Sequence, residues 1–159
     1  MCDVTPDISG LVDENGAINT QVDVRISITG DFKDSENSVK FTYYQPPEIN
    51  SIEPRYGPKD GGTKVRVTGE NFQKTNLRCS FGSKTVEAKF VNEKVLECEA
   101  PRSEVVALGM PLSVSMNDQQ FAHSGHRFYY YNWPQIKQIT PPLGPESGGT
   151  NITLKGSNF

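Results

Sequence analysis

Histidine is scarce in this chain, and its scarcity narrows the chemistry that the chain can perform. The 159 residues include two histidines, His123 and His126, with Ser124 and Gly125 between them. No Ser/His/Asp set, activated cysteine or catalytic pair of carboxylates can be assembled around them. Neither histidine is paired with an acid at the spacing of metal ligands. We therefore expect no catalytic, cofactor-binding or metal-binding residues, and we interpret both histidines as part of a solvated loop at a hairpin turn.

Long apolar runs and blocks of positive charge are missing as well. No apolar run approaches the ~18 to 20 residues that a membrane-spanning helix needs. The 16 basic and 19 acidic residues give a net charge of −3 at pH 7, and no basic stripe is present. We do not expect a nucleic-acid partner, because such partners require clustered Lys and Arg. Membrane contact is expected only through parts of a parent protein outside these residues.

Helical periodicity is absent from every stretch of ten or more residues, whereas strand-like segments recur. Such segments occupy residues 64–68, 86–90, 95–98, 112–116 and 128–131, and Gly- or Asn-containing turn signals separate them. The sequence therefore predicts an all-β chain. We expect four polar residues on these segments, Lys64, Arg66, Ser113 and Ser115, to face water. We expect eight apolar residues to be mostly buried: Val65, Val67, Phe72, Phe81, Leu96, Val114, Met116 and Phe128.

A signature of 26 residues occurs twice. Residues 47–72 read PEINSIEPRYGPKDGGTKVRVTGENF, and residues 134–159 read PQIKQITPPLGPESGGTNITLKGSNF. The copies lie 87 residues apart and are identical at 12 of the 26 positions. Self-similarity at a fixed spacing marks a repeat architecture, and a unit of this length suits a β-sandwich of roughly 100 residues.

The first 45 residues match the second half of the same unit. Residues 41–44 parallel residues 128–131 at the same offset, and Cys2 parallels Cys98. We therefore divide the chain into the C-terminal part of a first repeat (1–45), a complete repeat (46–132) and the N-terminal part of a third repeat (133–159). The division predicts an excerpt of a longer tandem array whose repeats are joined by short, proline-stiffened linkers.

The signature resembles the IPT/TIG domain. The shared pattern is P-x-I-x-x-I-x-P-x-x-G-P-x-x-G-G-T, then a short strand, then G-x-N-F. The resemblance implies an immunoglobulin-like (E-set) β-sandwich repeated in tandem, of the extracellular multi-copy kind. The residues that carry it are structural: Pro54, Gly57, Pro58, Gly61, Gly62, Thr63, Gly69, Asn71 and Phe72.

These motif residues have simple physical roles. Pro54 is expected to end the first strand, because proline donates no backbone hydrogen bond. Residues 57–58 and 61–63 are expected to form a tight connection that needs glycine. Phe72 is expected to anchor the core, and Asn71 to hydrogen-bond the local turn.

The resemblance also implies a disulfide between Cys79 and Cys98, which would stabilise the repeat by roughly 3 kcal/mol. The alternative is a pair of buried thiols in an intracellular protein. The partner of Cys2 would lie upstream of the chain. Residues 151–153 form the sequon Asn-Ile-Thr, so Asn151 is a possible glycosylation site if the chain is secreted.

Together these expectations predict a non-enzymatic module that acts as a structural spacer and protein-binding surface in a large extracellular or cell-surface protein. Its expected partners are other protein chains or neighbouring repeats of the same chain. Three alternatives stay open: a cytoskeletal or ciliary scaffold inside the cell, a transcription-factor dimerisation module, and an accessory domain of a carbohydrate-active enzyme. We interpret residues 128–131 and Trp133 as packing residues of the last strand and joint, with a sugar-stacking platform as the alternative.

Overall fold

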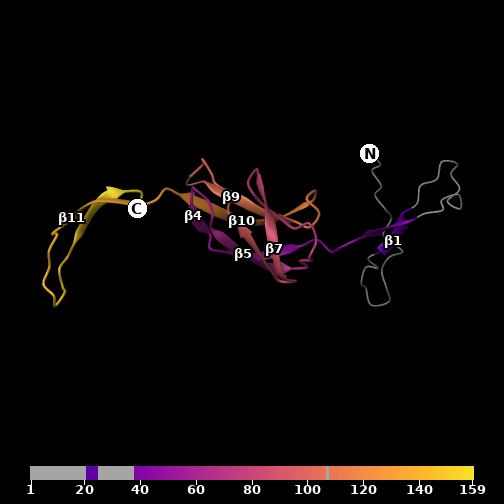
Figure 1. Cartoon of the computed structure of the whole chain (residues 1–159), viewed down its shortest axis with the longest axis horizontal. Coiled ribbons are helices and arrows are strands. Elements are labelled where there is room, and N and C mark those ends of the chain that lie inside the picture. Colours follow the sequence, from indigo (N-terminus) through magenta and orange to yellow (C-terminus); the bar gives the residue numbers. More distant parts are fainter. Residues whose placement is uncertain (1–20, 25–37, 107) are drawn as a thin grey trace. The chain divides into compact units, whose positions relative to one another are not determined.

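The computed structural model describes residues 21–24, 38–106 and 108–159 (Figure 1). These residues form strands, turns and irregular segments, and none of them is helical, in agreement with the all-β prediction. The strands in chain order are β1 (Gln21–Val24), β2 (Val39–Thr42), β3 (Glu48–Glu53), β4 (Tyr56–Pro58), β5 (Lys64–Glu70), β6 (Arg78–Phe81), β7 (Lys84–Asn92), β8 (Val95–Glu99), β9 (Gly109–Ser115), β10 (Phe121–Tyr131), β11 (Gln135–Thr140) and β12 (Thr153–Ser157).

Strands β1 and β2 belong to a first compact unit, Met1–Pro46, and pair with each other in antiparallel fashion. Val22 lies opposite Phe41, whose ring meets that of Tyr43 edge to face at a centroid distance of 5.0 Å. The side chains of Val24, Val39 and Phe41 are exposed. Cys2 lies outside the described residues, so the assignment of residues 1–45 to the end of a first repeat stays a proposal.

Strands β3 to β10 form one curled sheet in the order β3-β5-β8-β7-β6-β9-β10-β4 (Figure 1). Strand β7 is the corner of this sheet, because residues 84–87 pair with β6 whereas residues 88–92 pair with β8. The strands on either side of the corner thus form the two layers of a β-sandwich. Its core contains all eight apolar residues that the sequence predicts to be buried, with Val65, Val67, Phe72, Leu96, Val114 and Phe128 fully buried.

The prediction that Ser113 and Ser115 face water is wrong, although Lys64 and Arg66 are exposed as expected. Ser113 is 4% exposed and Ser115 is 0% exposed. Strand β9 lies between β6 and β10, so both of its edges are covered by neighbouring strands. Each small hydroxyl also has a partner, which is His123 for Ser113 and Asn117 for Ser115.

The hairpin turn predicted at Ser124 and Gly125 is also wrong. Both residues lie within β10, which continues from Phe121 to Tyr131 with a shift of register between His123 and Arg127. Gly125 supplies a positive φ of 70° at this bulge, a conformation that glycine adopts without strain. His123 and His126 are therefore strand residues rather than residues of a solvated loop.

The glycine-rich motif forms a strand and a turn rather than one tight connection. β3 ends directly before Pro54, as predicted. Residues 56–58 form β4, which pairs in parallel with residues 129–131 of β10. Gly61 and Gly62 then turn the chain with φ values of 84° and 81°. The Gly62 N–H donates to the Ala100 carbonyl at 2.9 Å and ties this turn to the end of β8.

Strands β11 and β12 reproduce the first strands of the sandwich. Their register shift between Ile136 and Gln138 lies 87 residues after the shift between Ile49 and Ser51. Asn71 and its counterpart Asn158 both adopt a positive φ, of 64° and 65°. The assignment of residues 133–159 to a third repeat remains a proposal that this recurrence supports.

Candidate protein-interaction surface and inter-repeat joint

The outer face of β10 carries a row of large side chains. Phe128 and Tyr130 point into the core and are 0% and 2% exposed. Successive side chains of a strand alternate between its faces, so Arg127, Tyr129 and Tyr131 face outward. Residues 128–131 are therefore not one packing group, as predicted from the sequence, but are divided between the two faces of the strand.

Strand β4 adds a fourth outward side chain to this row. Its parallel pairing with β10 places Tyr56 opposite Tyr129, and the two rings stack at a centroid distance of 5.4 Å and an interplanar angle of 26°. Tyr131 meets Trp133 edge to face at 6.1 Å. Tyr56, Trp133 and Tyr131 are 63%, 55% and 39% exposed. We call the set Tyr56, Tyr129, Tyr131 and Trp133 the aromatic strip.

Gly109 of β9 makes room for the side chains beside the strip. A Cβ atom at this position would lie 2.9 Å from both Arg127 Cδ and Tyr129 Cε1. Arg127 Nη1 donates a hydrogen bond to the Gly109 carbonyl at 2.7 Å. This bond holds the Arg127 side chain on the same face of the sheet as Tyr129. Sequence reasoning missed Tyr56 and Arg127, because their place beside the strip depends on the pairing of β10 with β4 and β9.

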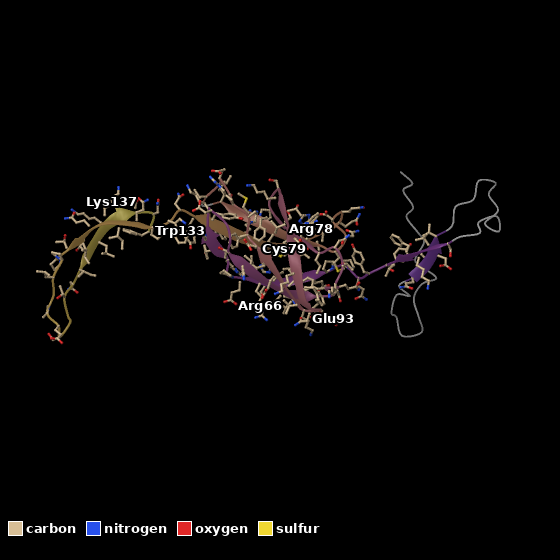
Figure 2. All side chains as sticks on the ribbon, viewed as in Figure 1. Arg66, Arg78, Cys79, Glu93, Trp133 and Lys137 are labelled. Atoms are coloured by element: carbon tan, nitrogen blue, oxygen red, sulfur yellow. A yellow bond between two sulfur atoms is a disulfide. The ribbon has the colours of Figure 1, made fainter. Side chains whose placement is uncertain are left out.

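Trp133 lies on the segment that follows β10 (Figure 2), and it forms hydrogen bonds through both its side chain and its carbonyl. Its indole Nε1–H donates to Asp60 Oδ2 at 2.9 Å. Its carbonyl accepts a hydrogen bond from Asn158 Nδ2 at 3.0 Å. Asp60 belongs to the turn after β4, and Asn158 follows β12. Trp133 is therefore hydrogen-bonded both to the complete sandwich and to the second copy of the signature. We call this connection the joint.

The two histidines flank the bulge of β10 and are both hydrogen-bonded. His123 Nδ1 lies 2.8 Å from Ser113 Oγ. His126 Nε2 lies 2.9 Å from the Asn50 carbonyl of β3, and it must donate because a carbonyl can only accept. This bond links β10 to the opposite end of the curled sheet. Both histidines thus have structural partners.

The predicted disulfide is present in the structure and joins the two layers of the sandwich. Cys79 of β6 is bonded to Cys98 of β8, with a Cα–Cα distance of 6.3 Å. Figure 2 labels Cys79 within the sandwich. The two residues are 0% and 2% exposed. The strands that carry them lie on opposite sides of the corner strand β7, so the bond fastens one layer to the other.

Among the residues that the structure describes, Tyr130 is a core residue whose pKa departs clearly from its ordinary value. Its hydroxyl donates to the Pro101 carbonyl at 2.8 Å. Burial raises the pKa of Tyr130 from 10.0 to about 12, because the phenolate would lose its hydration. A buried neutral phenol with a single backbone partner is a structural group rather than a catalytic one.

The described residues also contain a shallow groove over β7 and β8. Its charged lining carries both signs, with Lys64, Lys89, Glu87, Glu97 and Glu99 side by side. Small-molecule sites are lined predominantly by hydrophobic and aromatic side chains, whereas five of the seven residues that line this groove are charged and none is aromatic. Among residues 21–24, 38–106 and 108–159, no group of three or more His, Cys, Asp or Glu could hold a metal ion. No helix in this part of the chain is long and apolar enough to span a membrane.

Comparisons with known proteins identify relatives of this sandwich. The family model of the IPT/TIG domain matches residues 47–130, which is more than half of the chain. Human Plexin-A3 is 30% identical over 134 residues, an alignment that covers 77% of this chain and 7% of Plexin-A3.

Solved structures point to the same relatives. The structure of the full Plexin A4 extracellular region, domains 1 to 10, is 28% identical and superposes with a TM-score of 0.51, covering 77% of this chain and 10% of that one. A second Plexin A4 extracellular structure, of domains 1 to 8, has the same TM-score at 23% identity and covers 70% of this chain and 12% of that one. At this identity the similarity supports the fold and nothing further. The chain thus spans only a small part of the relatives it matches.

Proposed function

Because the chain belongs to the IPT/TIG family, whose fold is an immunoglobulin-like (E-set) β-sandwich, we propose that it serves as a non-enzymatic protein-interaction module and structural spacer in a larger protein. The aromatic strip is the observation that carries the proposal. Tyr, Trp and Arg are enriched at the centres of protein interfaces, where they supply most of the binding energy. Here Tyr56, Tyr131 and Trp133 are exposed, and Arg127 lies on the same face of β10, close to Tyr129.

The location of the module is extracellular or at the cell surface. The Plexin A4 relative at 28% identity is an extracellular region, and disulfides persist in oxidising compartments. The buried bond between Cys79 and Cys98 fits that setting. The remaining cysteine, Cys2, lies outside the described residues.

The spacer role rests on the joint at residues 132–134. A spacer must hold one repeat in a fixed position relative to the next, which a flexible linker does poorly. Trp133 is bonded to Asp60 on one side and to Asn158 on the other, and Pro134 stiffens the backbone that follows. The division of the chain into repeats at 46–132 and 133–159 is part of this proposal.

Site-specific photo-crosslinking tests the binding surface. Tyr56→p-benzoylphenylalanine places a crosslinker on the aromatic strip of the parent protein, displayed on cells. Val91→p-benzoylphenylalanine is the matched control, because Val91 is 44% exposed on β7, away from the strip. We expect crosslinks from position 56 to peptides of another chain or a neighbouring repeat, and none from position 91.

A further substitution makes the crosslinking result specific. Tyr129→Ala removes the ring that stacks on position 56, so it should weaken the partner contact and reduce the crosslink yield. Equal yields from positions 56 and 91 would contradict the proposed surface. Binding of the strip to a glycan array, without protein crosslinks, would instead favour a carbohydrate accessory role.

A further inference from the structure

The sequon at residues 151–153 has no role in the proposed interaction surface. Asn-Ile-Thr matches the acceptor sequence for N-linked glycosylation, in which the middle residue is not proline. No other asparagine within residues 1–157 is followed two positions later by Ser or Thr. In the structure Asn151 and Thr153 are exposed, and Thr153 begins β12.

The complete repeat shows which face of the strand the sequon occupies. At the offset of 87 residues, Asn151 corresponds to Lys64 and Thr153 to Arg66, both of which are exposed on β5. The residue between them, Val65, is 0% exposed and belongs to the core. The matching register of β11–β12 and β3–β5 carries this alternation over to the third copy. Asn151 and Thr153 therefore lie on the solvent face of the layer.

The segment before Asn151 leaves the acceptor side chain open. The Gly148 N–H donates to the Pro145 carbonyl at 3.0 Å, closing a turn. Gly149 then adopts a positive φ of 83°, and a Cβ atom built on it, or on its counterpart Gly62 in the complete repeat, would meet no other atom within 4 Å. Because Lys64, the counterpart of Asn151 in the complete repeat, is also exposed, a bulky group attached at Asn151 would project into solvent rather than into packed side chains.

We propose that Asn151 carries an N-linked glycan, an inference that rests on the extracellular location proposed above. The donor is an oligosaccharide linked to a lipid pyrophosphate. The Asn151 side-chain nitrogen forms a bond to the anomeric carbon of the first sugar and loses one proton. The bond from that carbon to the phosphate oxygen breaks, and the lipid pyrophosphate leaves with the electron pair. No oxidant or reductant is needed.

The position of the glycan restricts how partners approach the third repeat. A bulky, hydrated glycan covers the surface around its attachment site. That surface belongs to the layer equivalent to β3-β5-β8, whereas the aromatic strip of the second repeat lies on the layer that contains β10 and β4. Protein partners of the third repeat are therefore directed to the layer without the sugar.

Peptide mapping of the native protein tests the proposal. Trypsin releases Asn151 in the peptide of residues 138–155, and it releases Cys79 and Cys98 in the peptides of residues 79–84 and 95–102. Treatment with a peptide-N-glycosidase in heavy-oxygen water converts a glycosylated asparagine to labelled aspartate. We expect the 138–155 peptide to appear only after this treatment, in its labelled form, and the two cysteine peptides to be linked.

Two outcomes separate this proposal from the one it rests on. Recovery of unmodified 138–155 peptide together with linked cysteine peptides overturns glycosylation but leaves the extracellular location in place. Recovery of the unmodified peptide with both cysteines as free thiols overturns both proposals.

Variants of the whole chain, sent through the secretory pathway, test the role of strand position. Thr153→Ala should abolish the glycosidase-sensitive mobility shift, whereas Thr153→Ser should retain it. The double variant Lys64→Asn with Arg66→Thr builds the same sequon at the equivalent register and should add a second shift of similar size. A shift that persists in Thr153→Ala would show that the sugar is attached elsewhere and overturn the assignment.

Discussion

Phe72 shows how much of the sandwich depends on one residue of the repeated signature. It is 0% exposed, and its ring would lie 2.7 Å from a Cβ atom at Gly69. Phe72→Ala should lower the free energy of unfolding by ~3 to 5 kcal/mol, because it removes a buried ring and leaves a cavity. Phe159→Ala is the matched control, since its side chain is 76% exposed. Chemical denaturation measures both, and comparable losses would contradict the assignment of Phe72 to the core.

Tyr130 gives the sandwich a pH dependence in alkaline solution. Its pKa is raised to about 12, against an ordinary value of 10.0. Below pH 10 the phenol is protonated in both the folded and the unfolded chain, so the contribution of Tyr130 to stability is fully present. Between pH 10 and 12 the unfolded chain loses a proton that the folded chain retains, so stability falls by ~1.4 kcal/mol for each unit of difference in pKa. Denaturation at several pH values should show a smaller alkaline loss for Tyr130→Phe than for the wild-type chain; parallel curves would contradict this role.

At the scale of elements, the joint after β10 can be tested through the only tryptophan in the sequence, Trp133. Asp60→Ala removes the acceptor of the indole N–H. The fluorescence anisotropy of Trp133 should fall and its quenching by acrylamide should rise. The free energy of unfolding should change by about 1 kcal/mol or less. Ser147→Ala is the control, because Ser147 is the counterpart of Asp60 in the third copy. Unchanged anisotropy in Asp60→Ala would show that the bond does not hold the indole.

The elements that sequence reasoning predicted correctly are those encoded by nearby residues. Period-two alternation located β5, β8 and the core side of β9, and Pro54 located the end of β3. Burial of Ser113 and Ser115 was missed, because it depends on which strands flank β9. The parallel pairing of β4 with β10 was missed for the same reason, since its partners lie more than 70 positions apart in the chain.

At the scale of the whole molecule, the two copies of the signature separate local from long-range information. Both form a hairpin with the same register shift and the same positive-φ asparagine. The signature therefore encodes the backbone locally. Burial is different: Ile52 and Val67 are 3% and 0% exposed, whereas their counterparts Ile139 and Leu154 are each 43% exposed. Burial requires the opposing layer, which β6, β9 and β10 supply in the second repeat.

The sequence could predict only part of the aromatic strip and of the joint. Trp133 was expected at the joint from its place before Pro134. Its partner Asp60 was not, because an exposed acid in a glycine-rich turn has no pattern that marks it. The disulfide was predicted only through the family resemblance, since spacing alone does not show which cysteines lie close in space.

The parallel pairing of β4 with β10 has a consequence for a module held in a chain under tension. The Tyr129 N–H donates to the Arg55 carbonyl and the Lys59 N–H to the Tyr131 carbonyl, each at 2.8 Å. A pull on the N-terminal end of β4 and the C-terminal end of β10 slides two parallel strands along each other, so these bonds are loaded together rather than broken in succession. Forced unfolding is governed by the rate of crossing that barrier rather than by equilibrium stability.

Stretching of single molecules can measure this resistance. Lys59→Pro removes one of the two donors and should lower the rupture force, whereas Lys64→Ala, on the exposed face of β5, should not. After rupture, the bond between Cys79 and Cys98 should keep the segment between them from extending until a reductant is added. Rupture forces that are equal in Lys59→Pro and the wild-type chain would place the mechanical barrier elsewhere. If they differ as expected, a repeat built to position binding surfaces also bears load through a strand pair three residues long.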